Sequence, residues 1–133
     1  MKAFKKGQSL EQRVAIWAKR TLGWKTTKLR ELVRGKTTRR PWEVDVHAEK
    51  WHGLRHAWIE CKAHKVKRMH LLKLKDAVDD VKEARDEGIE KWAPNEIIMV
   101  SSVGFDSDAL ALAKKHEIKC FLAKEKGFEE QQS

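Results

Sequence analysis

The sequence predicts an α/β fold in which a central mixed sheet is flanked by helices. Apolar residues recur at helical spacing in three segments, and short apolar or alternating segments lie between them, in the order α-β-β-β-α-β-α-β. The 133 residues, 41% of them hydrophobic, are enough for one core. No internal repeat, linker or low-complexity segment divides the chain, so we expect a single domain over residues 1–133.

The first helix is predicted to begin after Ser9 and to end near Leu22. Ser9 and Gln12 have the spacing of a capping box, and Gly23 suits the position that follows a helix. One face of this helix is apolar and carries Leu10, Val14, Trp17, Ala18 and Leu22. Glu11 falls within the same face, where burying a lone carboxylate is costly. Either Glu11 interacts with the helix dipole in the first turn, or it points across the edge of the core at a functional site.

The strongest strand signal is a predicted hairpin, which follows a loosely alternating first strand at residues 24–33. Residues 43–47 and 57–62 alternate between apolar and polar side chains, as half-buried strands do. His52-Gly53 between them suits a two-residue turn, because glycine tolerates a positive φ. We therefore expect the two segments to pair as antiparallel strands.

A tight turn fixes which residues of the hairpin face each other. If Trp51 pairs with Leu54, paired residue numbers sum to 105, and Asp45 lies directly opposite Glu60. Opposed side chains share a face of the sheet, so one face is expected to carry Asp45, Glu60 and Lys62. The other face is expected to carry Val44, Val46, Ala57, Ile59 and Cys61.

The second half of the chain is expected to alternate between helix and strand. The predicted elements are a helix over residues 70–87, a strand over 97–100, a helix capped at 106–108 and a strand over 118–122. Gly88 ends the first of these helices. The polar tail, residues 129–133, is expected to fray.

The acidic face of the predicted hairpin has the chemistry of a metal site. Two carboxylates a few ångströms apart, those of Asp45 and Glu60, raise each other's pKa unless a cation lies between them. Oxygen ligands suit Mg²⁺ or Mn²⁺. Such an ion polarises a phosphoryl oxygen and activates water, and Lys62 could orient that water or stabilise developing charge. The alternative is a solvated face with ordinary cross-strand salt bridges.

The basic residues cluster on either side of this hairpin. The net charge is +9, and residues 25–40 together with residues 62–75 carry +12. A basic surface around an acidic centre indicates a phosphate-backbone ligand, that is, a nucleic acid. The candidate phosphate contacts are Arg39, Arg40, His64, Lys65, Lys67 and Arg68. The alternative is a basic surface that serves solubility alone.

Other residue types point less clearly to a function. His52 and His56, like Cys61 and His64, have spacings found in zinc sites, but the members of each pair are not expected to converge. No glycine-rich phosphate loop occurs, so ATP use is not supported. Two cysteines in apolar segments predict free thiols in a reducing cytoplasm. No apolar run approaches a membrane span, and no apolar stretch follows the basic residues 1–6, so neither a membrane anchor nor a signal peptide is expected.

The order of elements and the acidic residues together resemble the PD-(D/E)xK nuclease superfamily. Glu43-Val44-Asp45 and Trp58-Ile59-Glu60-Cys61-Lys62 resemble the E-x-D and (D/E)-x-K parts of that core. Gly7-Gln8-Ser9-Leu10-Glu11 resembles the G-x-x-x-E start of Mrr-like restriction endonucleases and archaeal Holliday junction resolvases. Residues 101–105, with the helix and strand after them, resemble the C-terminal half of the Mrr-like enzymes. Val44 stands where the family's name has proline.

The resemblance implies a fold, a site and a function. It implies a restriction-endonuclease-like αβββαβ core with an extra C-terminal helix and strand. Mg²⁺ would be bound by Asp45, Glu60 and the carbonyl of Cys61, with Mn²⁺ as a substitute. Lys62 would be the catalytic lysine, and Glu11 would support the metal or its water.

The expected function is that of a cytoplasmic, magnesium-dependent endonuclease that hydrolyses phosphodiester bonds, in DNA rather than RNA. One alternative is a structure-selective Holliday junction resolvase, which would need a homodimer to cut two strands. Another is a nucleic-acid-binding module without catalysis, although Asp45, Glu60 and Lys62 are all intact.

Overall fold

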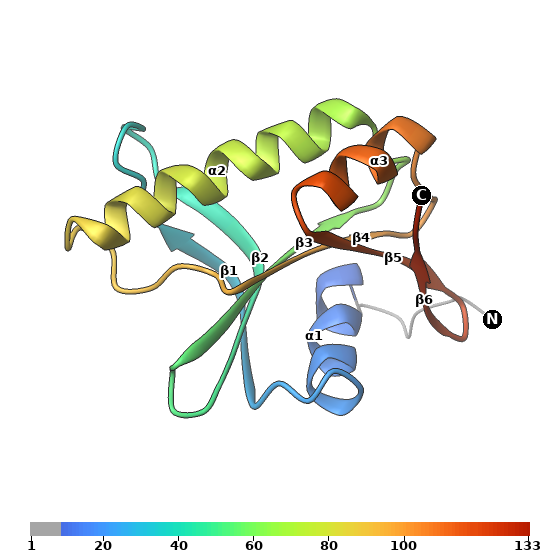
Figure 1. Cartoon of the computed structure of the whole chain (residues 1–133). Helices are drawn as coiled ribbons and strands as arrows, with labels where there is room; N and C mark the ends of the chain where they lie inside the picture. The colour runs from blue at the N-terminus through green and yellow to red at the C-terminus, as the bar shows by residue number, and fades with distance from the viewer. Residues whose placement is uncertain (1–8) are drawn as a thin grey trace.

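Six strands form one mixed sheet with helices on both faces in the computed structural model, which describes residues 9–133 (Figure 1). The strands are β1 (Thr26–Val33), β2 (Trp42–Lys50), β3 (Arg55–Lys62), β4 (Glu96–Ser101), β5 (Ile118–Lys124) and β6 (Gly127–Gln131). They lie side by side in sequence order; β3, β4 and β5 run parallel, and the other neighbours are antiparallel. The predicted fold class is therefore confirmed.

Three helices cover the sheet. Helix α1 (Leu10–Arg20) lies on one face, and α2 (Arg68–Asp86) and α3 (Ser107–Lys115) lie on the other (Figure 1). The predicted capping box is present at the start of α1, where Ser9 Oγ accepts from the Gln12 N–H and Gln12 Oε1 accepts from the Ser9 N–H. Gly7, which opens the G-x-x-x-E segment, lies outside the described residues, as do residues 1–6. Within the described part of the chain, no helix is long and apolar enough to cross a membrane.

The hairpin between β2 and β3 has the predicted register. Every pair from Lys50 and Arg55 to Val46 and Ile59 sums to 105. The Leu54 N–H donates to the Trp51 carbonyl at 3.1 Å, and φ is 56° at His52 and 83° at Gly53. Positive φ at both central residues is the mark of a type I′ turn, whose twist matches that of the strands.

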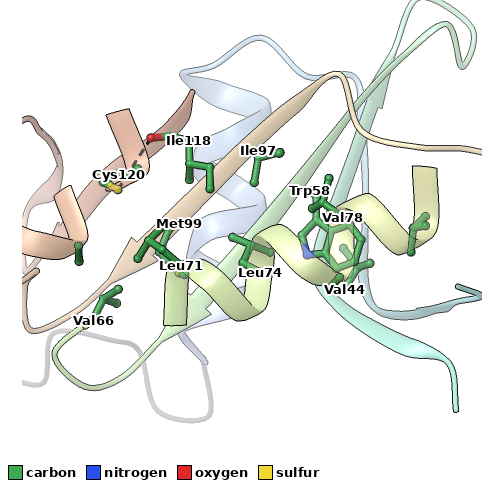
Figure 2. Packing of buried hydrophobic residues seen from close by; sticks show 14 of the residues in the cluster. Val44, Trp58, Val66, Leu71, Leu74, Val78, Ile97, Met99, Ile118 and Cys120 are labelled. Carbon is green, nitrogen blue, oxygen red and sulfur yellow. Dashed lines mark hydrogen bonds between the residues drawn. The ribbon is translucent and has the colours of Figure 1, made fainter. Parts of the chain in front are cut away.

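The predicted division of side chains between the two faces is wrong at Val44. Val46 packs in the cluster that includes α1, whereas Val44 packs with Trp58 and Val78 on the α2 side (Figure 2). The ladder between β1 and β2 is interrupted where Arg30 faces Asp45, and Arg30 takes a φ of 52°. Simple alternation is lost at this interruption, so Val44 turns to the α2 side.

Two apolar clusters, one on each face, hold the helices against the sheet. The α2 and α3 side buries Trp58, Leu71, Leu74, Val78, Ile97 and Met99, and the α1 side buries Val14, Ala18, Val46, Ile59, Ile98 and Val100 (Figure 2 shows the first cluster). Cys120 lies in the first cluster, and Cys61 packs against the second; both are free thiols.

The expectation that the C-terminal tail frays is wrong. Residues 127–131 form β6, which pairs antiparallel with β5 at the edge of the sheet. Phe128 stacks on Trp17 of α1 with ring centroids 4.3 Å apart, and Lys124 pairs with Glu129 at 2.9 Å. One aromatic side chain and the backbone ladder order this otherwise polar segment.

Candidate active site

A cleft of about 370 Å³ lies between Glu11 of α1, the ends of β2 and β3, and the first turns of α2. It brings together four of the residues predicted to form the site: Glu11, Asp45, Glu60 and Lys62, together with the backbone of Cys61. Glu43 also lines the cleft. A larger cavity, of about 610 Å³, lies at the far end of the sheet around β5 and is lined by none of these residues.

Asp45 is positioned by the neighbouring strand. Its Oδ2 accepts a hydrogen bond from the backbone N–H of Cys61 at 2.8 Å. The ladder between β2 and β3 ends at Val46 and Ile59, so this carboxylate takes the place of the next backbone acceptor. Burial raises the pKa of Asp45; the Cys61 hydrogen bond opposes the shift, and the nearby charge of Glu11 adds to it.

Glu60 lies next to Asp45 and is more strongly perturbed. Burial, followed by the negative charge of Asp45, raises the pKa of Glu60 to about 7. Trp58 Nε1 donates to Glu60 Oε1 at 3.4 Å, and Lys62 Nζ lies 3.6 Å from Glu60 Oε2. These weak contacts do not neutralise two crowded carboxylates. A hard divalent cation between the two carboxylates would neutralise them. Carboxylate oxygens are ligands that suit Mg²⁺ or Mn²⁺.

Glu11 enters the cleft from the opposite side. Its side chain is 22% exposed, and its Oε1 lies 4.0 Å from Arg30 Nη2. It lines the same cleft as Asp45 and Glu60, and its charge contributes to the raised pKa of Asp45. Glu11 thus lies in the first turn of α1, where the helix dipole favours an acid, and it also lines the cleft.

Cys61 presents its backbone, not its thiol, to the acids. The thiol packs against the cluster beneath α1, and burial, followed by the charge of Asp45, raises its pKa far above the ordinary value. A thiol that stays protonated is neither a nucleophile nor a metal ligand. Cys61 contributes its N–H to Asp45, and its carbonyl is the predicted third metal ligand.

The basic residues after β3 form one rim of the cleft. His70 and Lys73 of α2 line it one helical turn apart. The basic segment after the hairpin indicated a phosphate or water contact for His70, but Lys73 was not predicted. Their spacing of three residues was the available signal, because it places both on one face of the helix. The pKa of His70 is lowered by burial and then by the surrounding positive charges, the first of them His64.

The predicted phosphate contacts between β3 and α2 differ in how close they lie to the cleft. The rings of His64 and His70 lie 4.9 Å apart, so His64 is beside the cleft-lining histidine. Lys65 Nζ pairs with Asp106 Oδ1 at 3.3 Å, which directs it toward the start of α3. Lys67 and Arg68 are exposed at the start of α2.

The loop that carries Arg39 and Arg40 is held to α2 by Asp80. Asp80 is only 8% exposed, and its carboxylate accepts hydrogen bonds at 2.8–2.9 Å from four donors on the loop and on β2. The donors are Thr37 N–H, Thr37 Oγ1, Thr38 Oγ1 and Trp42 Nε1. Burial alone would raise the pKa of Asp80, but these donors outweigh burial and hold the pKa well below its usual range.

This anchor requires a glycine and orders the wall of the cleft. A Cβ added at Gly35 would lie 1.7 Å from Asp80 Oδ2, so a larger residue cannot fit without moving the loop. Pro41 and Trp42, which follow Arg40, line the cleft. Arg39 and Arg40 are exposed next to them.

Comparisons with known proteins show the fold. No protein-family model and no curated protein matches the sequence. The structure is similar to the protein of unknown function AF1548, with a TM-score of 0.63, 21% identity, and coverage of 84% of this chain and 57% of that one. It is also similar to a repair endonuclease from Pyrococcus abyssi, with a TM-score of 0.58, 18% identity, and coverage of 91% of this chain and 49% of that one.

The fold is therefore restriction-endonuclease-like, with a six-stranded mixed sheet flanked by helices. The chain spans about half the length of these two structures, at 57% and 49%. At this level of identity the similarity defines the class of fold alone.

Proposed function

We propose that this protein is a metal-dependent nuclease of the PD-(D/E)xK type that hydrolyses phosphodiester bonds, with DNA as its substrate. The observation that carries the proposal is the cleft itself. Asp45 and Glu60 are crowded there with raised pKa values, and Lys62 lies beside them. A repair endonuclease has the same fold. The chemistry of this cleft fits the same kind of activity, the hydrolysis of a phosphodiester bond.

Each residue of the cleft has a role in this proposal. A bound Mg²⁺ would polarise a phosphoryl oxygen and lower the pKa of a water molecule. Asp45 and Glu60 would hold the ion with the Cys61 carbonyl, and Asp45 is already oriented by the Cys61 N–H. Lys62 would place its ammonium group against the attacking water or the developing negative charge. Glu11 would accept a hydrogen bond from water on the opposite side of the cleft.

The basic rim supports a polyanionic substrate. His70, Lys73 and Lys62 line the cleft, and the chain carries a net charge of +9. Phosphate contacts supply most of the sequence-independent affinity of a protein for nucleic acid. The substrate backbone would therefore pass along the start of α2 and bring one phosphate to the carboxylates.

The experiment is a cleavage assay on matched substrates. Purified protein is incubated with linear duplex, flap, four-way-junction and single-stranded DNA, and with RNA, in the presence of Mg²⁺, Mn²⁺ or a chelator. We expect metal-dependent cleavage of DNA that the chelator abolishes and that Asp45→Asn eliminates. Preference for the four-way junction would identify the resolvase alternative. Binding without cleavage by the wild type under every metal condition would overturn the enzyme proposal in favour of a binding module.

A further inference from the structure

Three metal-ligating side chains converge on the hairpin at a distance from the cleft. His47 and Glu49 of β2 and His56 of β3 have ligand atoms that all lie within 4.8 Å of one another. Glu49 pairs directly with His56 in the ladder, and His47 is two residues before Glu49 on the same strand. Residues two apart on a strand and residues opposed across a hairpin share a face, so the three side chains meet on the α2 side.

The hydrogen bonds of His47 fix the orientation of its imidazole. His47 Nδ1 lies 2.7 Å from Glu31 Oε1. A carboxylate only accepts, so Nδ1 carries the proton and Nε2 presents a lone pair. That Nε2 lies 2.8 Å from Nδ1 of His56. A histidine ligand whose other ring nitrogen donates to a carboxylate is the usual arrangement around a protein-bound metal.

The surroundings hold this ring rigidly. His47 is 2% exposed and stacks on the Trp92 indole, with centroids 3.5 Å apart and an interplanar angle of 5°. Trp92 Nε1 donates to the same Glu31 oxygen at 3.1 Å. His56 is held through its backbone N–H, which donates to Asn95 Oδ1 at 2.7 Å. Strands β1, β2 and β3 and the loop before β4 thus all contribute to the position of the two imidazoles.

We propose that His47 Nε2, His56 Nδ1 and a carboxylate oxygen of Glu49 bind a divalent transition metal, for which Zn²⁺ is the best fit. Two imidazoles and one carboxylate suit zinc and its neighbours in the first transition series, and do not suit Mg²⁺. Tetrahedral ligands at about 2.0–2.1 Å from zinc are separated by about 3.3–3.4 Å. The His47–His56 and His56–Glu49 separations of 2.8 Å and 3.6 Å lie on either side of that value, so small side-chain movements admit the ion.

A fourth, water ligand is available on the outer side of this site. His56 lines a cleft of about 350 Å³ with Trp92 and Asn95, through which solvent and an ion reach it. The side chain of Glu49 is 31% exposed. Glu31 and Glu49 supply two negative charges beside two imidazoles; Lys28 lies 3.7 Å from Glu31, and a divalent cation would balance the remaining charge. The ion would join the hairpin to β1 through Glu31, and it would stabilise the sheet next to the cleft acids.

The test measures zinc binding separately from the candidate active site. The protein is prepared metal-free, both as wild type and as the double variant Asp45→Asn/Glu60→Gln, in which the cleft acids are neutral. Equilibrium dialysis against Zn²⁺ is expected to give one ion per chain in the double variant and at least one in the wild type, whose cleft acids can also hold a divalent ion. Co²⁺ as a probe is expected to give the visible absorption of a four-coordinate site. Saturating zinc should raise the midpoint of thermal unfolding, because it binds the folded state.

Substitutions on the hairpin distinguish the trio from the cleft. Glu49→Gln and His56→Ala should each weaken zinc binding at least tenfold and remove the thermal shift, and Glu31→Gln should weaken it by about 10–100-fold without changing the stoichiometry. His52→Ala, in the exposed turn of the same hairpin, is the matched control and should bind as the wild type does. Glu49→Gln replaces only the carboxylate of a partly exposed side chain by an amide, so it tests the site even if His56→Ala does not fold.

Two outcomes would overturn the proposal. One is zinc binding that disappears in Asp45→Asn/Glu60→Gln and persists in Glu49→Gln, which would place the ion in the cleft. The other is an absence of binding at millimolar zinc, which would leave the trio as a hydrogen-bonded network. Neither result would contradict magnesium-dependent cleavage, so the two proposals fail independently.

Discussion

The Asp45 carboxylate and the Cys61 backbone N–H form a 2.8 Å hydrogen bond between two strands at the point where their ladder ends. In this contact a side-chain carboxylate accepts the hydrogen bond that a backbone carbonyl would accept in a continuous ladder. It uses one oxygen of Asp45 for structure and leaves the other for the cleft. The two crowded carboxylates, Asp45 and Glu60, therefore lie just beyond the end of the ladder.

Glu60→Gln should stabilise the metal-free protein at about pH 8 and leave it nearly unchanged at about pH 5. The pKa of Glu60 is raised to about 7 in the folded state, so the folded protein binds more protons than the unfolded chain between its ordinary pKa and 7. Stability from the protonated group is complete below the unfolded pKa and is lost as the pH rises through 7. The gain at pH 8 should be at most about 3 kcal/mol. Urea unfolding with a chelator present measures it, and an equal gain at both pH values would contradict the assigned cause.

Lys62→Ala should abolish cleavage while leaving affinity for DNA nearly unchanged. Lys62 lies 3.6 Å from Glu60 at the centre of the cleft, and one phosphate contact among many is a small part of the binding free energy. Single-turnover cleavage and fluorescence anisotropy measure the two properties. The matched control is Lys65→Ala, which removes the same charge from a residue paired with Asp106 and should retain cleavage. A parallel loss of affinity and cleavage in Lys62→Ala would assign Lys62 to binding alone.

Replacing Lys65, Lys67 and Arg68 together with alanine should flatten the salt dependence of DNA binding. Each lost phosphate contact removes about 0.9 from the slope of log K against log salt, so the limit is about 2.7. The ion pair of Lys65 with Asp106 should keep the change below that limit. The loss should be the same for different DNA sequences, because phosphate contacts carry no sequence information.

The control for that experiment removes the same charge elsewhere. Lys114, Lys115 and Lys126 are exposed, and none of them lines the cleft. Their triple alanine variant should change the slope far less. Equal slopes for the two triple variants would show that the start of α2 does not face the nucleic acid.

Asp80→Asn should destabilise the protein by about 1–3 kcal/mol. Each carboxylate oxygen of Asp80 accepts from two donors, so the amide of asparagine would direct its own N–H groups at two of them. The lowered pKa means that the carboxylate adds stability above its unfolded pKa, and that this stability is lost as the pH falls toward the folded pKa. Asp79→Asn, one residue earlier and 52% exposed, is the control and should change little. Urea unfolding at neutral pH measures both, and equal effects would contradict the anchoring role.

The register of the hairpin could be predicted because it depends on local information. A glycine at the turn and alternation on both sides fix the pairing of β2 with β3, and the sum of 105 follows. The interruption at Arg30 and Asp45 could not be predicted in the same way. The interruption depends on the φ of 52° at Arg30. Nothing in the sequence around Arg30 indicates that this residue takes a positive φ.

Other features could not be predicted from the sequence because they depend on contacts between residues far apart in the chain. Asp80 occupies the apolar stripe of α2, but its four donors lie about 40 residues earlier in the chain. The ordering of β6 depends on Phe128 meeting Trp17 from the other end of the sequence. The cluster of His47, Glu49 and His56 could be predicted, because the predicted register already places Glu49 opposite His56. The spacing of His52 and His56 along the chain gives no sign of this pairing across the hairpin.

The anchoring of the 34–41 loop has a consequence for the thermodynamics of binding. Asp80 ties this loop to α2 on both sides of Arg39 and Arg40, through Thr37 before them and Trp42 after them. A polyanion that reaches this surface meets basic side chains whose backbone is already ordered. Little conformational entropy is then lost on association, and more of the electrostatic attraction remains as net affinity. Loosening the loop with Asp80→Asn should therefore weaken DNA binding through entropy, although Asp80 carries the wrong charge to touch a phosphate.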